Sequence, residues 1–266
     1  MTFFLFIAKW RIKINQLYSK IKNYKSTILI KKNSNQSENF YLFYFVTFPI
    51  FISLPCPVGT IISPSKWNME NSFEDLITTY IENKVGISEH FLSVELANNL
   101  KQNLHNLNDN SQLSAAGIGN SEKLSYDGAI RSDSIYWLDK KHNNAFENEF
   151  FAQMEAFILY LNESCYAGIT GYEFHYSLYE KGDFYLKHLD QFKNNPSRKY
   201  SIISYLNSDW QESHGGELLI HQDNNNQKIS PTQGKTVFFK SDELVHEVLV
   251  TQNTRMSITG WLKSDR

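Results

Sequence analysis

Cysteine is scarce in this chain. Its 266 residues include two cysteines, Cys56 and Cys165, and no Cys-x-x-Cys pair. A disulfide framework needs more cysteines, and a structural zinc site needs clustered ones. Two isolated cysteines are typical of a reducing compartment, so the sequence predicts a cytoplasmic protein.

The chain also lacks a long apolar run and a strong net charge. The longest aromatic and apolar stretch, residues 40–55, is interrupted by Thr47, Pro49 and Ser53, and it is shorter than the roughly 20 apolar residues of a membrane helix. The formal net charge is only -2. For residues 69–266 we therefore expect neither a membrane nor a nucleic-acid partner.

What is present points to a helical part followed by a β-rich part. Helical spacing of apolar residues predicts helices over residues 73–83, 94–107 and 145–161, with Ser93 as the N-cap of the second. Four apolar residues of the third helix fall on or near one face: Phe146, Phe150, Phe157 and Leu161. Beyond Gly168, short alternating stretches are separated by Gly, Asn, Pro and Asp. This order favours a mainly β fold with packed helices, a double-stranded β-helix or jelly roll.

Two side chains in the β-rich part have the spacing of metal ligands. Alternate residues of a strand share a face, so His188 and Asp190 would point the same way. A histidine from another strand, for which His246 is the candidate, would complete a 2-His-1-carboxylate triad. Such a triad leaves open positions on iron(II) and is usual in non-haem iron oxygenases. In isolation, His188 and Asp190 could also be a hydrogen-bonded surface pair.

An arginine follows the candidate histidine at short range. Residues 245–250 alternate, residues 251–254 are turn-like, and residues 255–261 alternate again, which predicts a hairpin that brings Arg255 alongside His246. A guanidinium binds a carboxylate through two parallel hydrogen bonds. Alternate residues of a strand share a face, so the last strand should have a pocket face and a core face. The pocket face would carry Arg255, Ser257, Thr259 and Trp261, and the core face Met256, Ile258 and Leu262.

With these motifs in order, the chain resembles the prolyl 4-hydroxylase family of Fe(II)/2-oxoglutarate dioxygenases. It is similar in particular to bacterial proteins that are like the hypoxia-sensing prolyl hydroxylases. The similarity covers roughly residues 87–263 and is carried by residues 130–137, 179–190, 198–207, 210, 215–218, 246–248 and 255–261.

The resemblance implies a role for each matching residue. His188, Asp190 and His246 would bind Fe(II). Arg255 and the hydroxyl of Tyr205 would bind the distal carboxylate of 2-oxoglutarate, with Ile203 against its methylene groups. Three further residues would complete the site: Tyr179 near the chelating end, Thr259 near the metal, and Trp261 as a pocket wall. Arg198 is a weaker match, and residues 113–128 occupy the place of the loop that closes over substrate.

The resemblance also implies the chemistry. With O2 as second cosubstrate, 2-oxoglutarate would be converted to succinate and CO2 while a C–H bond is hydroxylated, and ascorbate would serve as reductant. The implied substrate is a prolyl residue of a protein. A small-molecule or free amino-acid hydroxylase and a non-catalytic jelly-roll binding module stay open as alternatives. Three other histidines, His175, His214 and His221, are interpreted as structural or surface residues without a ligand role.

The first 68 residues differ in character from the rest. They carry nine Lys and Arg against one acid, Glu38, whereas the remainder carries 17 against 27. Their basic region is too long for a signal peptide. A membrane anchor over residues 40–55 would send the domain outward, away from 2-oxoglutarate. We favour a start at Met69, because 36 of these 68 residues are Phe, Ile, Lys, Asn or Tyr, whose codons are rich in A and T. The predicted division is an extension, 1–68, and one dioxygenase domain, 69–266, with a helical part (69–165) and a jelly-roll core (about 166–266).

Overall fold

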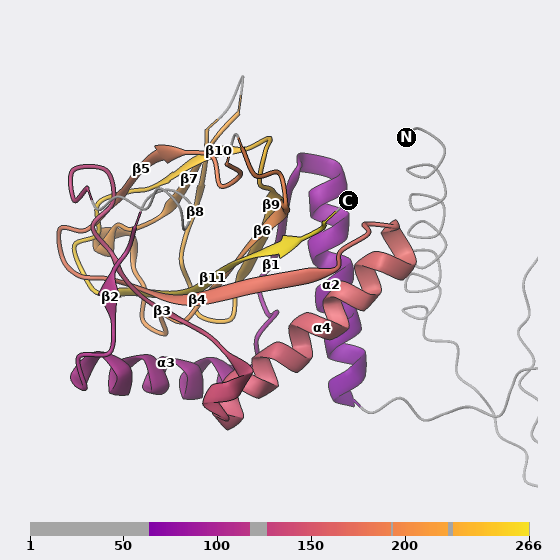
Figure 1. Ribbon diagram of the computed structural model, residues 1–266, viewed down its shortest axis with the longest axis horizontal. Helices are drawn as coiled ribbons and strands as arrows, with labels where there is room; N and C mark the ends of the chain where they lie inside the picture. Colours follow the sequence, from indigo (N-terminus) through magenta and orange to yellow (C-terminus); the bar gives the residue numbers. More distant parts are fainter. Residues whose placement is uncertain (1–63, 118–126, 193, 223–225, 266) are drawn as a thin grey trace, which may run out of the picture.

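Two antiparallel sheets face each other in the computed structural model, which describes residues 64–117, 127–192, 194–222 and 226–265 (Figure 1). The larger sheet contains β1 (Val85–Ser88), β2 (Ser114–Ala115), β3 (Ser134–Trp137), β4 (Gly171–Tyr179), β6 (Arg198–Tyr205), β9 (Thr236–Lys240) and β11 (Arg255–Lys263). The smaller sheet contains β5 (Tyr185–His188), β7 (Leu218–His221), β8 (Gln227–Ile229) and β10 (Val245–Val248). The strand orders are β1-β9-β6-β11-β4-β3-β2 and β5-β10-β7-β8. The predicted jelly-roll class is confirmed.

Three helices cover the face of the larger sheet that points away from the smaller one (Figure 1). They are α2 (Pro64–Asn83), α3 (Val94–Asp109) and α4 (Ala145–Cys165), and two short 3-10 helices, η1 (Lys140–His142) and η2 (Glu212–His214), lie in connections. The predicted cap of α3 is confirmed, because the Ser93 hydroxyl accepts a hydrogen bond from the Leu96 amide at 3.0 Å. Of the four apolar residues expected on or near one face of α4, Phe150, Phe157 and Leu161 are buried, whereas Phe146, in the first turn of the helix, is 38% exposed.

The sheets divide the interior into two cores. An outer core joins the helices to the larger sheet, and an inner core lies between the sheets. The predicted alternation of β11 is confirmed, since Met256, Ile258 and Leu262 belong to the outer core. Their neighbours Arg255, Thr259 and Trp261 line a cavity between the sheets. The site therefore lies on the inner face of the larger sheet.

The predicted hairpin between residues 245–250 and 255–261 is wrong. β10 pairs with β5 and β7, whereas β11 pairs with β4 and β6. The turn carries the chain from one sheet across to the other. His246 and Arg255 consequently face the same cavity from opposite sheets.

The first part of the domain is less helical than predicted. β1, β2 and β3 all precede residue 166 and extend both edges of the larger sheet. Residues 1–63 and 118–126 lie outside the described part of the chain, so the predictions for the extension and for most of the 113–128 loop concern residues beyond it. Met69 lies inside α2. Among the described residues, no helix combines the length and the apolar character of a membrane span.

Candidate metal centre

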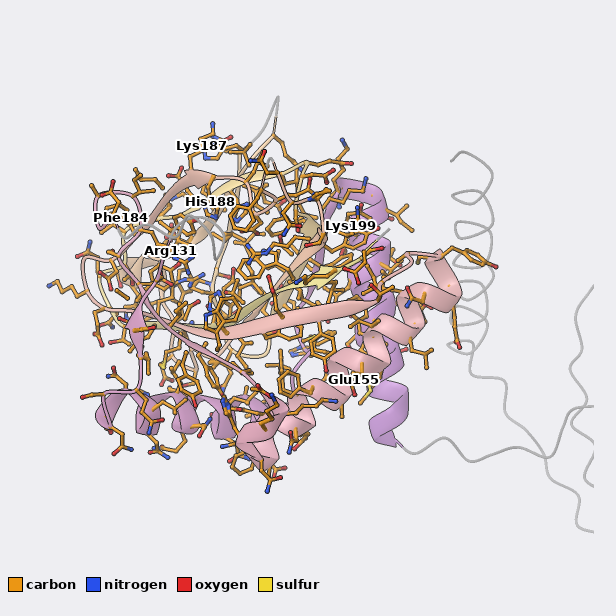
Figure 2. All side chains as sticks on the ribbon, in the orientation of Figure 1. Arg131, Glu155, Phe184, Lys187, His188 and Lys199 are labelled. Atoms are coloured by element: carbon orange, nitrogen blue, oxygen red, sulfur yellow. The ribbon has the colours of Figure 1, made fainter. Side chains whose placement is uncertain are left out.

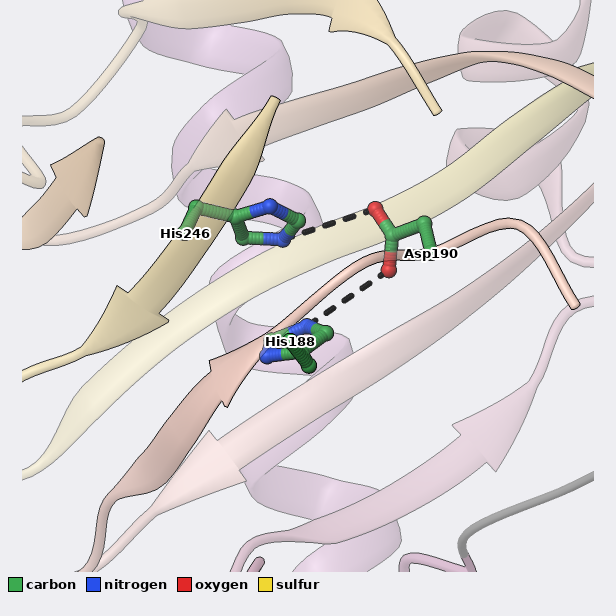
Figure 3. Close-up of side chains that lie close together, drawn as sticks. All are labelled: His188, Asp190 and His246. Atoms are coloured by element: carbon green, nitrogen blue, oxygen red, sulfur yellow. Dashed lines mark ion pairs between the residues drawn. The ribbon is translucent and has the colours of Figure 1, made fainter. Parts of the chain in front are cut away.

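Three predicted ligand residues meet at one point between the sheets (Figure 3). His188 ends β5, Asp190 follows it by two residues, and His246 lies on β10 directly opposite His188. His188 Nε2 is 3.6 Å from Asp190 Oδ1, and His246 Nε2 is 3.5 Å from Asp190 Oδ2. One ligand atom from each residue lies within 4.8 Å of the others. Two imidazoles and one carboxylate in this arrangement could hold a metal ion.

Backbone carbonyls fix the orientation of both imidazoles. His188 Nδ1 is 2.7 Å from Leu186 O, and His246 Nδ1 is 3.0 Å from Leu244 O. A carbonyl only accepts, so each Nδ1 carries the proton and donates it. Each Nε2 then has its lone pair directed at the centre, as in metal-binding histidines generally.

The protonation states suit a cation. Burial would raise the pKa of Asp190, but His246, His188 and the Ser201 hydroxyl outweigh it and hold the pKa well below its usual range. Burial lowers the pKa of His246 to about 4, although Asp190 acts in the opposite direction. At neutral pH the centre therefore presents an ionised carboxylate and a neutral His246, the forms that bind a metal.

Arg255 carries a buried positive charge. It is 3% exposed, its Nε donates to Gly216 O at 2.8 Å, and one terminal nitrogen donates to Ser257 Oγ at 3.4 Å. No acidic side chain of the described residues forms an ion pair with it. Because burying an unpaired charge is costly, this arrangement favours an anionic ligand.

The residues predicted to accompany Arg255 do surround it. Its guanidinium carbon lies 4.8 Å from the ring centre of Tyr179 and 5.2 Å from that of Tyr205. The Tyr205 hydroxyl is buried and has no hydrogen-bond partner among the described residues. Burial raises the pKa of Tyr205 to about 12, with the charge of Arg255 acting against it, so the hydroxyl stays a donor. Ile203, two residues earlier on β6, lines the same cavity.

Thr259 and Trp261 lie farther along the cavity wall. The Trp261 Nε1 is buried without a partner among the described residues. Arg198, the weaker match, stacks on Trp261 with its guanidinium carbon 3.4 Å from a ring centre and forms an ion pair with Glu173 at 2.7 Å. The structure thus brings every predicted site residue to this cavity or into contact with its walls.

Several residues at the site were missed. Ser201 donates to Asp190 Oδ2 at 2.6 Å, and His175, Arg131 and Tyr185 line the cavity. The alternation of side chains along a strand could have predicted Ser201, because it shares a strand face with Ile203. It could likewise have placed His175, interpreted as structural or surface, on the pocket face of β4, where it is buried. The contacts of Arg131 with β5 have no sequence signal.

Comparisons with known proteins agree with this geometry. The family model of the 2OG-Fe(II) oxygenase superfamily matches residues 174–263. A crystal structure of a Pseudomonas putida prolyl-4-hydroxylase is 30% identical with a TM-score of 0.64, and the match covers 74% of this chain and 100% of that one. A prolyl hydroxylase from Trichoplax adhaerens, solved with a peptide fragment of the hypoxia inducible factor oxygen degradation domain, shares the fold at 22% identity and a TM-score of 0.69, over 76% and 94% of the two chains. The chain belongs to the prolyl 4-hydroxylase family of the 2OG-Fe(II) oxygenases.

Proposed function

We propose that the protein is an Fe(II)- and 2-oxoglutarate-dependent dioxygenase that hydroxylates a prolyl residue of a protein. The observation that carries the proposal is Arg255, a buried guanidinium that no acid of residues 64–117, 127–192, 194–222 and 226–265 pairs with, on the wall of the same cavity as a 2-His-1-carboxylate cluster. A dicarboxylate with one end near the metal would satisfy both features. Family membership supplies the reaction class, an oxidation.

Each residue has a part in this function. His188, Asp190 and His246 hold Fe(II), which when bound supplies the redox chemistry that splits 2-oxoglutarate into succinate and CO2 and oxidises the substrate C–H bond with O2. Arg255 and the Tyr205 hydroxyl donate to the distal carboxylate. Ile203 packs on the methylene groups, and ascorbate serves as an external reductant.

The other cavity residues position the reactants. Tyr179 offers its hydroxyl near the chelating end of 2-oxoglutarate, and Thr259 offers one near the metal. Burial raises the pKa of Tyr179 far above its ordinary value, so it acts as a neutral donor. Trp261 forms a wall that keeps water from the reacting atoms.

Exposed apolar side chains near the cavity support a peptide as substrate. Ile130, Trp137, Leu186 and Leu189 are 39–46% exposed. Trp137 lies 6.3 Å from Trp261, ring centre to ring centre, and Leu186 and Leu189 flank His188 in sequence. Exposed apolar side chains of this kind suit contact with an extended chain that reaches the cavity through one side chain.

The test has two stages. In the first, purified protein with Fe(II) and 2-oxoglutarate is assayed for succinate, with Asp190→Ala as the matched control that lacks one ligand. In the second, cell extract proteins are treated with wild type or Asp190→Ala and searched by mass spectrometry for one added oxygen on proline. Oxygen added only to metabolites would identify a small-molecule hydroxylase, and no succinate under any condition would identify a binding module. Either result contradicts the proposal.

A further inference from the structure

Tyr185 lies flat against one of the candidate metal ligands. Its ring centre is 3.5 Å from that of His188, and the two planes differ by 13°. The Arg131 guanidinium lies over the same tyrosine ring, with its carbon 4.7 Å from the ring centre. We call this arrangement the Arg131–Tyr185–His188 stack.

The far end of the stack is anchored. Arg131 donates two hydrogen bonds to Asp133, from Nε to Oδ1 at 2.5 Å and from a terminal nitrogen to Oδ2 at 2.9 Å. Asp133 is 1% exposed, so water does not compete for this pair. A backbone hydrogen bond joins the same two segments, because Leu186 N donates to Ile130 O at 2.9 Å. Figure 2 shows Arg131, Phe184 and His188 at the same end of the molecule.

His188 needs such support more than the other histidine ligand does. It lies on β5, an edge strand whose pairing with β10 is irregular, and its side chain is 14% exposed. The His246 side chain is 3% exposed and lies on a central strand. The hydrogen bond from His188 Nδ1 to Leu186 O leaves the ring free to tilt about that bond. A second ring packed on its face removes this freedom.

We propose that Tyr185 is a positioning residue for His188, and that the paired Arg131 and Asp133 hold Tyr185 in place. The proposal rests on the proposed role of His188 as a metal ligand. In this role Tyr185 acts on the metal site through His188. Groups that orient a metal ligand typically affect metal affinity by about 10- to 100-fold when they are removed.

The test measures Co(II) binding to the metal-free protein by its visible absorption, in the absence of any substrate. Tyr185→Phe keeps the ring and loses only the hydroxyl, so its affinity and spectrum should match wild type. Tyr185→Leu loses the ring and should bind Co(II) about 10- to 100-fold more weakly, with a shifted spectrum. Tyr172→Leu is the matched control. Its ring packs on Phe151, 5.7 Å between centres, outside the site, and its loss should leave Co(II) binding unchanged.

The outcomes separate the inference from the function. Wild type that fails to bind Co(II) would overturn the metal site and with it the proposed function. Wild-type affinity and spectrum in Tyr185→Leu would overturn the inference alone, as would equal weakening in Tyr185→Phe and Tyr185→Leu. If Tyr185→Leu does not fold, the double variant Arg131→Met/Asp133→Leu provides the test. The double variant leaves no unpaired charge. It should also weaken Co(II) binding, by a smaller factor than Tyr185→Leu. Unchanged Co(II) binding would refute the role of Arg131 and Asp133 as the anchor.

Discussion

Arg255→Met should raise the stability of the ligand-free protein and lower the stability gained from 2-oxoglutarate. In the ligand-free protein the guanidinium is buried, and its hydrogen bonds to described residues go to Gly216 O and Ser257 Oγ. The desolvation of a charged group costs several kcal/mol. The 2.8 Å bond to Gly216 O returns about 1.5–3 kcal/mol, and the 3.4 Å bond to Ser257 Oγ is too long to return as much. A methionine of similar length removes the charge and keeps most of the packing. We therefore expect the ligand-free variant to be more stable by about 1–2 kcal/mol, which corresponds to roughly 2–4 °C in Tm per kcal/mol.

In the presence of 2-oxoglutarate, wild type should be more stable than Arg255→Met. A ligand present at 100 times its Kd stabilises the native state by about 2.7 kcal/mol. Loss of one partner of a buried charge pair costs about 2–5 kcal/mol, or roughly 30- to 5,000-fold in affinity. The variant should therefore lose about two thirds or more of the ligand-induced rise in Tm.

Thermal unfolding of the Mn(II)-loaded protein, with and without 2-oxoglutarate, measures both effects. Arg255→Lys is the control, because it keeps the charge and loses the planar fork, and it should bind with intermediate affinity. A ligand-free Arg255→Met protein that is less stable than wild type would show that the guanidinium is satisfied within the fold. An unchanged response to 2-oxoglutarate would refute Arg255 as the carboxylate-binding group.

Three further changes test other parts of the fold and of the site. Gly260→Ala should destabilise the protein by about 1–3 kcal/mol in urea unfolding, because the new methyl group would overlap the Phe174 side chain; an unchanged midpoint would contradict this. Ser201→Ala removes the 2.6 Å hydrogen bond to Asp190 and should weaken Co(II) binding about tenfold, and equal affinity would show that the hydroxyl does not orient the carboxylate. Burial lowers the pKa of His175 to about 3, so the unfolded chain binds a proton between about pH 6.5 and 3 that the folded one does not, and stability falls as pH falls through that window. His175→Gln should flatten this decline in the metal-free protein, and parallel urea midpoints at pH 7 and pH 4.5 would refute it.

The local part of the site was predictable from the sequence. His188 and Asp190 share a direction because side chains alternate along an extended chain, and the same rule sorted the two faces of β11. This information lies within a few residues, so no knowledge of the partner strands was needed. Family resemblance then supplied the roles of Tyr205 and Ile203.

What was missed depends on contacts between distant segments. The turn between His246 and Arg255 looks like a hairpin turn, but the sheet that each strand joins is decided by β5 and β4, far away in the sequence. Likewise, β1 has only four residues, and it is a strand because it pairs with β9 at the edge of the larger sheet. The Arg131–Tyr185–His188 stack joins segments about 50 residues apart, and no periodicity reports such a contact.

The division of the site between two sheets has a mechanical consequence. Both histidine ligands belong to the smaller sheet, whereas Arg255 and Tyr205 belong to the larger one. A ligand bound by residues of both sheets would therefore link the two sheets to each other. Without it, the sheets are joined across the cavity by the apolar side chains between them and by hydrogen bonds such as Ser201 to Asp190 and Arg255 to Gly216, so we expect the ligand to restrict the motion of one sheet against the other.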